Sequence, residues 1–472
     1  MADGYARLTN EPQRGVNIKQ MVGRAYQFAM SDPKGPVYLV GSREAMEEEI
    51  ESYPLEKRMW EGIGPAALTE DVVRLITGAL LEAEEPLVIT GYCGRNHATV
   101  EALVRLVNNF PGLRVLDTGG SDMCFPNDHP GYLGLRYGMD DSITTADVII
   151  VADCDVPWIP TRCKPKSSAR IFHIDSDPLK CQMPVFYLPS EGRWKADTFT
   201  AFHQISESRV LKMVEYSNTM PEKLAQINSM SKDRQTRLVA SGTNRDESIA
   251  DLALPTISNQ LNPSYLAAAI RRAVPDNSIF AVEAVTVTPF VADQVKPTIP
   301  GTWLNCGGGG LGWSGGGALG IKLATKDRGE QRFVCQIVGD GTFLFSVPGS
   351  VYWISQRYKL PVLTIVINNK GWNAPRRSLL IVHPEGEGSK VSNRDLHIEF
   401  EPGPDYAGIA KAAAGGRLWA GKAATVGELE AALGQAVESV KNGTGAVLEA
   451  VLESEEPVDG KSQQANEGEM PG

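Results

Sequence analysis

The fold of this chain is decided by two stretches, Phe333-Val-Cys-Gln-Ile-Val-Gly-Asp-Gly341 and Pro361-Val-Leu-Thr-Ile-Val-Ile-Asn-Asn369. Each stretch begins with an apolar run typical of a buried strand, and each ends in polar residues. The segment between them, Ser346 to Tyr358, is predicted to be helical. We therefore predict a strand–helix–strand unit of a parallel sheet, an arrangement that places ligands at the carboxyl ends of its strands.

The polar residues at these strand ends have the chemistry of a Mg²⁺-diphosphate site. Asp340 and Asn369 offer oxygen atoms, and Mg²⁺ takes oxygen ligands and completes its octahedral shell with phosphate oxygens and water. Gly339 and Gly341 allow the backbone to approach a diphosphate closely, and the following helix offers its first amide groups to the anion. The alternative is a tight turn followed by an unrelated Asn-Asn turn, which the spacing and the two strands disfavour.

The pattern closely resembles the motif of thiamine diphosphate enzymes, in which GDG and NN are separated by one helix and one strand. The resemblance implies that Asp340, the side chain of Asn369 and the carbonyl of Gly371 bind the metal ion. It also implies cofactor contacts from the motif residues Gly339, Asp340, Gly341, Thr342 and Asn369. Within this family the cofactor carries out the chemistry, and these residues anchor it.

A glycine-rich run from Cys306 to Gly317 is a second candidate cofactor segment. Gly307, Gly309 and Gly312 fit the dinucleotide pattern G-x-G-x-x-G. However, the preceding residues 302–305 are expected to make a poor strand, and no acidic residue ends a strand about 20 residues further on, as that pattern requires. The dinucleotide interpretation is therefore disfavoured.

This run instead resembles the thiamine diphosphate decarboxylases of the benzoylformate and acetolactate type. The resemblance implies that Leu311 supports the bent form of the cofactor and that the Gly309 carbonyl accepts a hydrogen bond from its 4′-amino group. It also implies that Thr286, in the segment Glu283-Ala-Val-Thr286, contacts the diphosphate. An ordinary core leucine is the alternative for Leu311 taken alone.

Composition excludes several classes of function. The chain has 472 residues, and its 46 Lys and Arg against 57 Asp and Glu give a net charge of −11, which argues against nucleic-acid binding. We find no apolar run of 18 or more residues, so no membrane segment is expected. The seven cysteines form no C-x-x-C pair, which indicates a reducing compartment. We expect a cytoplasmic protein, or an organellar one if the native N-terminus is longer.

The chain is predicted to be an α/β protein of consecutive doubly wound parallel-sheet domains, with a thiamine diphosphate-binding fold and a Rossmann-like central domain. Predicted strands at 85–90, 146–152 and 170–175 define the central domain. The predicted organisation is a remnant of a pyrimidine-binding domain at 1–50, the central domain at 66–205, a linker at 206–260, the diphosphate- and Mg²⁺-binding domain at 261–455 and a disordered tail at 456–472.

The central domain also resembles that of the family, through Pro86-Leu-Val-Ile-Thr-Gly91 and His173-Ile-Asp-Ser-Asp-Pro178. In some members this domain binds FAD or ADP, and in others it is structural. The residues here do not support FAD. Asp175 and Asp177 are expected to be loop residues at a strand end rather than ligands.

The first block departs from the family. Met1-Ala-Asp-Gly-Tyr-Ala-Arg-Leu-Thr9 resembles the helix that follows the catalytic glutamate, which normally lies a few residues upstream of this string. A helix predicted at 16–30 and a strand predicted at 35–40 resemble the end of the same domain. The sequence therefore offers no candidate catalytic residue, and we expect a shortened pyrimidine-binding domain.

Two functions follow from the resemblance. In the first, the chain belongs to the 2-keto-acid decarboxylase and carboligase lineage, acetolactate synthase-like, and breaks or forms C–C bonds through a C2 ylide. Its substrate would be a small 2-keto acid or aldehyde, and acetolactate synthesis, benzoylformate-type decarboxylation and benzaldehyde-type carboligation stay open. In the second, it is a catalytically inactive, truncated partner of a full-length paralogue. Family active sites form between subunits, which implies a homodimer or homotetramer, or an assembly with such a paralogue.

Overall fold

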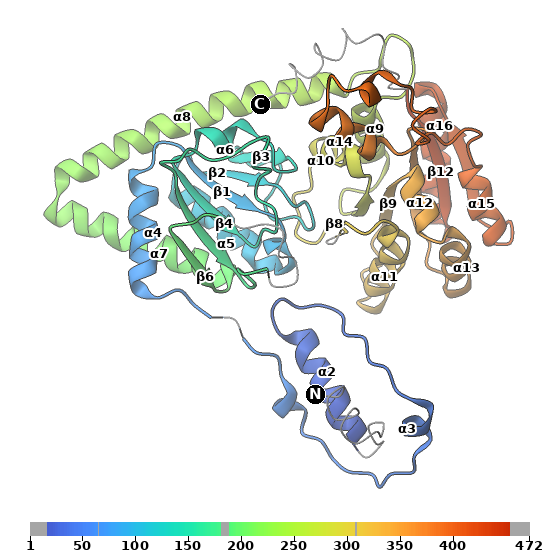
Figure 1. Ribbon diagram of the computed structural model, residues 1–472, viewed down its shortest axis with the longest axis horizontal. Helices are drawn as coiled ribbons and strands as arrows, with labels where there is room; N and C mark the ends of the chain where they lie inside the picture. The colour runs from blue at the N-terminus through green and yellow to red at the C-terminus, as the bar shows by residue number, and fades with distance from the viewer. Residues whose placement is uncertain (1–16, 65, 181–187, 307–308, 454–472) are drawn as a thin grey trace.

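The computed structural model describes residues 17–64, 66–180, 188–306 and 309–453. The predicted tail at 456–472, the string Met1 to Thr9 and Gly307 lie outside these ranges. The described chain forms two six-stranded sheets, and every strand pair in both sheets is parallel (Figure 1). The predicted α/β fold with consecutive parallel-sheet domains is thereby confirmed.

The central sheet has the strand order β3-β2-β1-β4-β5-β6. Its elements are α4 (Glu70–Glu82), β1 (Pro86–Thr90), η3 (Cys93–Arg95), α5 (His97–Asn109), β2 (Arg114–Asp117), β3 (Tyr132–Leu135), α6 (Asp141–Thr145), β4 (Val148–Ala152), β5 (Arg170–Asp175), β6 (Gly192–Lys195) and α7 (Thr198–Thr219). Alternate residues of β1 face opposite sides, so Val88 packs under α4, α5 and α7 while Leu87 and Ile89 pack under α6. Burial on both faces explains why β1 and β4 are continuous apolar runs.

The second sheet has the order β11-β12-β10-β9-β7-β8. Its elements are α9 (Pro263–Ala273), β7 (Ile279–Glu283), η4 (Val285–Val287), α10 (Thr288–Val295), β8 (Trp303–Asn305), α11 (Trp313–Asp327), β9 (Val334–Gly339), α12 (Asp340–Phe345), α13 (Pro348–Tyr358), β10 (Leu363–Asn368), α14 (Asn373–Val382), η5 (Glu387–Lys390), α15 (Tyr406–Ala413), β11 (Trp419–Ala423), α16 (Val426–Lys441) and β12 (Ala446–Val451). Helices α9, α10 and α16 cover one face, and α11, α13 and α15 cover the other. The two predicted strands are β9 and β10, which pair directly.

The expectation that residues 302–305 make a poor strand was wrong in part. Trp303–Asn305 forms β8, a short strand at the edge of the second sheet. Its position depends on a contact that is distant in the sequence, because the Trp303 indole Nε1 donates a hydrogen bond to the Gly120 carbonyl at 2.9 Å. An ion pair of 3.2 Å between Arg136 and Asp293 adds a second link between the two domains.

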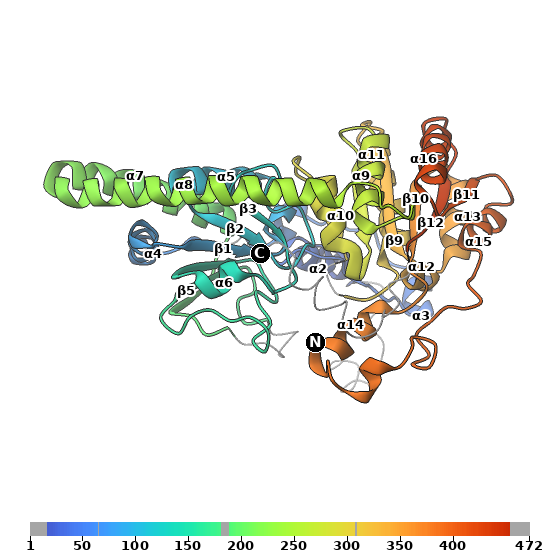
Figure 2. The ribbon, with the colours of Figure 1, turned by 90° about the horizontal axis from the view of Figure 1, so that it is seen from above.

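The segment expected to be a linker, 206–260, is largely helical. It contains most of α7 and all of α8 (Pro221–Leu252), a helix of 32 residues that begins with a proline in its first turn, where proline is tolerated. Figures 1 and 2 show α8 running along the central domain to the second domain. Near the C-terminal end of α8, the Ile249 carbonyl accepts a hydrogen bond of 2.7 Å from the side-chain amide of Gln294 in α10. The helix therefore contacts the second domain as well as the central one.

The first block, residues 17–64, contains α2 (Ile18–Met30), α3 (Arg43–Glu47) and η2 (Lys57–Trp60), and it lies apart from the two sheets in Figure 1. The prediction of a strand at 35–40 was wrong, because these residues pair with no other strand in the described ranges. Tyr38 is 90% exposed, and no residue of the block is buried. A strand needs a partner for its backbone groups, and the described part of the chain offers none here.

None of the helices in the described ranges combines the length and the apolar composition that a membrane span requires.

Candidate functional site

The strands β9 and β10 bring the two predicted motifs to one edge of the second sheet. Gly339 ends β9 and pairs with Ile367 of β10, so Asp340 and Asn369 follow neighbouring strand ends. Asp340 is buried at the start of α12. One carboxylate oxygen accepts a hydrogen bond from the Gly341 amide at 2.7 Å, and the other accepts one from the Gly371 amide at 3.1 Å. The structure therefore places Asp340 directly against the backbone that follows β10.

Asn369 carries the feature that points to a metal ion. Its side-chain oxygen Oδ1 is buried and receives no hydrogen bond from any residue that the structure describes. Its backbone amide, with those of Lys370 and Gly371, stabilises the charge of Asp340. Buried polar atoms are almost always satisfied, so an unsatisfied amide oxygen on a residue whose backbone interacts with a carboxylate fits a cation that takes oxygen ligands. The predicted third ligand, the Gly371 carbonyl, accepts a hydrogen bond from the Asn373 amide at 3.1 Å.

Burial raises the pKa of Asp340 to about 6, although the surrounding amide groups favour its charged form. A divalent ion needs the carboxylate, so Mg²⁺ is expected to bind weakly below about pH 6, where Asp340 takes up a proton.

We expect the metal-free protein to lose stability as the pH rises from about 4 to about 6. The pKa of Asp340 is about 6 in the folded state and near 3.8 in the unfolded chain, so the folded state holds this proton more tightly. Its stabilising effect is complete below pH 3.8 and is lost as the pH rises through 6, with a limit of about 3 kcal/mol. Urea denaturation of Asp340→Asn and the original protein should agree at low pH, and the variant should be more stable at neutral pH. A difference that does not change with pH would contradict this assignment.

Two glycines of the site are required by close packing. A Cβ on Gly341 would meet the Trp372 ring at 2.3 Å. The Trp372 ring lies edge-to-face against Phe345 and Phe400, with centroids 5.6 and 4.9 Å apart. Gly371 has a φ of +149°, and a Cβ there would meet the Ile398 carbonyl at 2.1 Å. The aromatic cluster was missed by sequence reasoning, which assigned Gly341 to the cofactor and Gly371 to the metal ion.

Glu283 was also missed as a positioning residue. It ends β7 and is 1% exposed, and its carboxylate accepts hydrogen bonds from the amides of Gly312, Trp313 and Ser314 at 3.0, 3.2 and 2.7 Å. A carboxylate satisfies the free amides at a helix N-terminus and interacts favourably with the helix dipole. Glu283 thereby fixes the start of α11 beside β7. The available signal was an acidic residue directly after an apolar strand.

Replacing Glu283 by glutamine should destabilise the protein by about 2 kcal/mol, because three buried amides lose their charged acceptor. Urea denaturation at neutral pH measures this loss. Glu330→Gln is a matched control, since Glu330 is exposed before β9. Equal stability of the two variants would show that the carboxylate charge does not hold α11.

The other predicted site residues differ in how far they are exposed to solvent. Gly309 has a φ of +66° and open space around it, and Leu311 is 38% exposed. Their loop reaches α12, because a Cβ on Gly312 would meet the Phe345 carbonyl at 2.4 Å. Thr342 is buried within α12. The Thr286 carbonyl in η4 accepts a hydrogen bond from Arg377, which follows the Asn-Asn motif.

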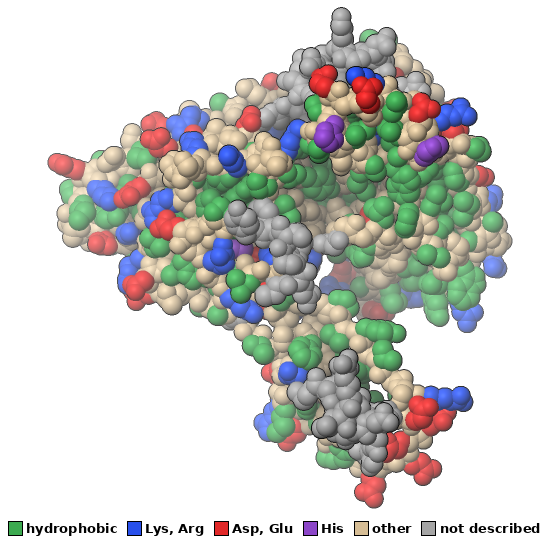
Figure 3. Space-filling model, in the orientation of Figure 1, with side chains coloured by type: hydrophobic (Ala, Val, Ile, Leu, Met, Phe, Trp, Pro, Cys, Tyr) green, Lys and Arg blue, Asp and Glu red, His purple; other side chains and the backbone are tan. Residues whose placement is uncertain are grey.

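The surface beside the site is strongly apolar. Figure 3 shows hydrophobic side chains gathered over the second domain. Four large apolar residues that follow β9 are exposed, namely Leu344, Phe345, Val347 and Trp353, and the last three are more than half exposed. Such a group of large apolar side chains is typical of an interaction surface.

In the central domain, Asp175 is committed to internal contacts. It is fully buried and accepts hydrogen bonds from the Tyr92 hydroxyl at 2.7 Å and the Lys180 ammonium at 2.8 Å. Burial alone would raise the pKa of Asp175. The hydrogen bond from His173 and the positive charge of Lys180 outweigh this effect, so the pKa is lowered. The backbone amide of Asp177 donates a hydrogen bond to the Asp175 carboxylate at 2.7 Å. Both aspartates are strand-end residues in a self-contained network.

Two regions of the chain match models of protein families. Residues 73–185 match "Thiamine pyrophosphate enzyme, central domain", and residues 284–450 match "Thiamine pyrophosphate enzyme, C-terminal TPP binding domain", where thiamine pyrophosphate is another name for thiamine diphosphate. The second region contains β9, β10 and the site between them.

Curated relatives are similar over part of their length. The 2-hydroxyacyl-CoA lyase 2 of Mus musculus is 27% identical over 312 residues, which is 65% of this chain and 45% of that protein. The benzoylformate decarboxylase of Pseudomonas aeruginosa is 28% identical over 186 residues, or 39% of this chain and 32% of that protein. The matched part thus spans less than half the length of either relative.

Solved structures share the fold at low sequence identity. The benzoylformate decarboxylase from Polynucleobacter necessarius superposes with a TM-score of 0.70 and 18% identity, covering 94% of this chain and 76% of that one. The thiamine diphosphate-dependent 4-hydroxybenzoylformate decarboxylase from Rhodococcus jostii gives a TM-score of 0.68 and 19% identity, with coverages of 94% and 76%. These similarities establish the fold.

Proposed function

Because this chain belongs to the thiamine pyrophosphate enzyme family, we propose that Asp340, Asn369 and the Gly371 carbonyl hold Mg²⁺ and, through it, the diphosphate of thiamine diphosphate. The observation that carries the proposal is the buried Asn369 Oδ1, which has no donor in the described part of the chain and belongs to a residue whose backbone amide interacts with the Asp340 carboxylate. A bound cation would satisfy that oxygen and compensate the buried charge.

The remaining site residues have supporting roles in this proposal. Gly339, Gly341 and Thr342 form the start of α12, whose free amide groups can contact the diphosphate. The Gly309 carbonyl and Leu311 would orient the rest of the cofactor, and Glu283 holds their loop through the amides of α11. When bound, thiamine diphosphate supplies a carbon nucleophile that adds to a carbonyl carbon. The described residues bind and orient it.

The activity we propose is that of the 2-keto-acid decarboxylase and carboligase lineage, with a small 2-keto acid or an aldehyde as substrate. The names of two relatives, a 2-hydroxyacyl-CoA lyase and a benzoylformate decarboxylase, support cleavage of a C–C bond. Benzoylformate is itself a 2-keto acid.

A second function is favoured by the apolar surface that includes Phe345, Val347 and Trp353. A catalytically inactive form of this lineage could bind a full-length paralogue through that surface, and the paralogue would contribute its own residues to the Asp340 site. The oligomeric states that we propose for this lineage are a homodimer, a homotetramer or an assembly with the full-length paralogue.

Calorimetry and a turnover assay separate these functions. The chain should bind thiamine diphosphate only when Mg²⁺ is present. Release of CO₂ from pyruvate or benzoylformate by the chain alone would support the enzyme and exclude the inactive partner. Binding without turnover, together with a change in activity when a full-length paralogue is added, would support the partner. A chain that does not bind the cofactor with Mg²⁺ would contradict both functions.

A further inference from the structure

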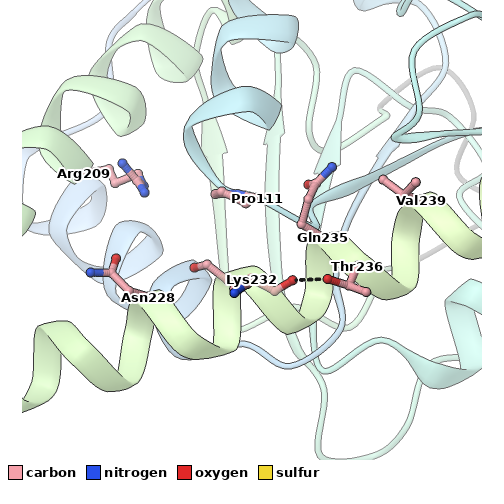
Figure 4. A pocket seen from close by; sticks show the side chains of 8 residues that line it. Pro111, Arg209, Asn228, Lys232, Gln235, Thr236 and Val239 are labelled. Carbon is pink, nitrogen blue, oxygen red and sulfur yellow. Dashed lines mark hydrogen bonds between the residues drawn. The ribbon is translucent and has the colours of Figure 1, made fainter.

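The α7–α8 helix pair contains an open pocket of about 570 Å³ that the proposed function does not use. It lies against the loop that leads into β2. Pro111, Arg209, Asn228, Ser231, Lys232, Gln235, Thr236 and Val239 line it (Figure 4). Its volume is within the range of about 300–1,000 Å³ that is usual for small-molecule sites.

The spacing of the lining residues explains how the pocket forms. Asn228, Lys232, Gln235 and Val239 are three or four residues apart, so they share one face of α8, while Arg209 comes from α7 (Figure 4). The loop before β2 fixes the pocket floor, because the Gln235 amide oxygen accepts a hydrogen bond from the Gly112 amide at 2.9 Å. The pocket is therefore held by three segments that are distant in the sequence.

Arg209 is a charged group without a polar partner in the described part of the chain. Its Nε is buried and makes no hydrogen bond, and its guanidinium lies 5.5 Å from the centre of the Phe110 ring. Burial lowers the pKa of Arg209, and no carboxylate opposes that shift. A buried donor without an acceptor costs about 1–3 kcal/mol, so an anionic ligand would relieve this cost.

Arg234, which is buried, adds a second guanidinium to the same region as the half-buried Arg209. Arg234 is 4% exposed and donates to the Ser231 hydroxyl of the pocket and to two backbone carbonyls, and its Nε also lacks an acceptor. Burial lowers the pKa of Arg234. The carboxylate of Asp147 opposes this shift, and the positive charges of Arg237 and Arg209 add to it.

Two other basic residues of α8 are neutralised, in contrast to those at the pocket. Lys223 pairs with Glu82 at 2.8 Å, and Arg237 pairs with Glu85 at 3.0 Å. Among the described residues, neither Arg209 nor Lys232 has a carboxylate at ion-pair distance, and no acidic residue lines the pocket. The positive charges of Arg209 and Lys232 are thus unpaired at this pocket.

We propose that this pocket binds a small organic phosphate, with the phosphate group at Arg209 and Lys232 and the organic part along Pro111 and Val239. A phosphate carries up to two charges and several acceptor oxygens, which suits two unpaired cations together with the Asn228 amide. A carboxylate brings one charge and two oxygens, so it would leave part of this donor set unused.

Calorimetry with AMP, in buffer free of Mg²⁺, tests the proposal. The chain should bind AMP saturably, and inorganic phosphate should compete with it. Both Arg209→Gln and Lys232→Gln should raise the Kd about tenfold or more, since each removes a charge-assisted hydrogen bond. Lys232 is exposed, so its substitution leaves the packing unchanged.

Lys212→Gln is the matched control, because Lys212 lies one turn further along α7 and does not line the pocket. It should change the Kd for AMP by less than about twofold. Asp340→Ala should also leave this Kd within about twofold, which would show that the pocket is distinct from the site at β9 and β10. The proposal is overturned if AMP does not bind saturably, if phosphate does not compete, if Lys232→Gln behaves like Lys212→Gln, or if Asp340→Ala abolishes AMP binding.

Discussion

Asp340→Ala is expected to lower the Mg²⁺-dependent affinity for thiamine diphosphate about 100-fold or more, a loss of about 3 kcal/mol. The variant removes the carboxylate that lies buried against the amides of Gly341 and Gly371. Asn369 Oδ1 would then have to hold a divalent ion without a charged neighbour. Isothermal titration calorimetry at about pH 7.5, above the pKa of Asp340, measures the effect.

The control for this experiment is Asp327→Ala, which removes an exposed carboxylate at the end of α11 in the same domain. It should leave the affinity unchanged. Asp340→Asn keeps the size of the side chain and should lose affinity as Asp340→Ala does, which excludes misfolding as the cause. Unchanged cofactor binding in Asp340→Asn would remove Asp340 from the metal site.

Gly371→Ala should be the most disruptive single-methyl change at the site. The new Cβ would meet the Ile398 carbonyl at 2.1 Å, and the φ of +149° is one that alanine rarely adopts. The segment that carries Asn369 must shift to avoid the clash. We expect a loss of about 3 kcal/mol in unfolding free energy, and cofactor binding should be lost with it.

Gly434→Ala provides the comparison, because a Cβ on this exposed glycine of α16 meets no heavy atom within 4 Å. It should stabilise the protein by about 0.5–1 kcal/mol, as expected for alanine in a helix. Chemical denaturation of both variants gives the difference. If Gly371→Ala unfolds like the original protein, the backbone after β10 is more adaptable than its packing indicates.

The local pattern was sufficient to predict the strands that carry the site. Continuous apolar runs identify β9 and β10, and the structure places their polar ends side by side as predicted. The roles assigned to Asp340, Asn369 and Gly371 as ligands stay predictions until a bound metal ion is measured. Trp372 and Glu283 could not be assigned in this way, because their functions depend on contacts with segments that are distant in the sequence.

The length of α8 was missed for a different reason. Its buried stripe consists of Ile227, Ser231, Arg234, Leu238, Gly242 and Ile249, and half of these residues are polar or lack a side chain. The apolar period that identifies a packed helix is therefore faint. The strand expected at 35–40 shows the opposite error, since an apolar run was present but no neighbouring strand was available to it.

The strand order of the second sheet has a consequence for how the protein is made. β12 lies between β10 and β11 although both precede it in the chain. While a ribosome is still translating, β10 has an open edge until residues 446–451 have emerged, and such edges attract other chains. A message that ends before codon 446 would therefore yield a product that aggregates, even though it encodes Asp340, Asn369 and Gly371 intact.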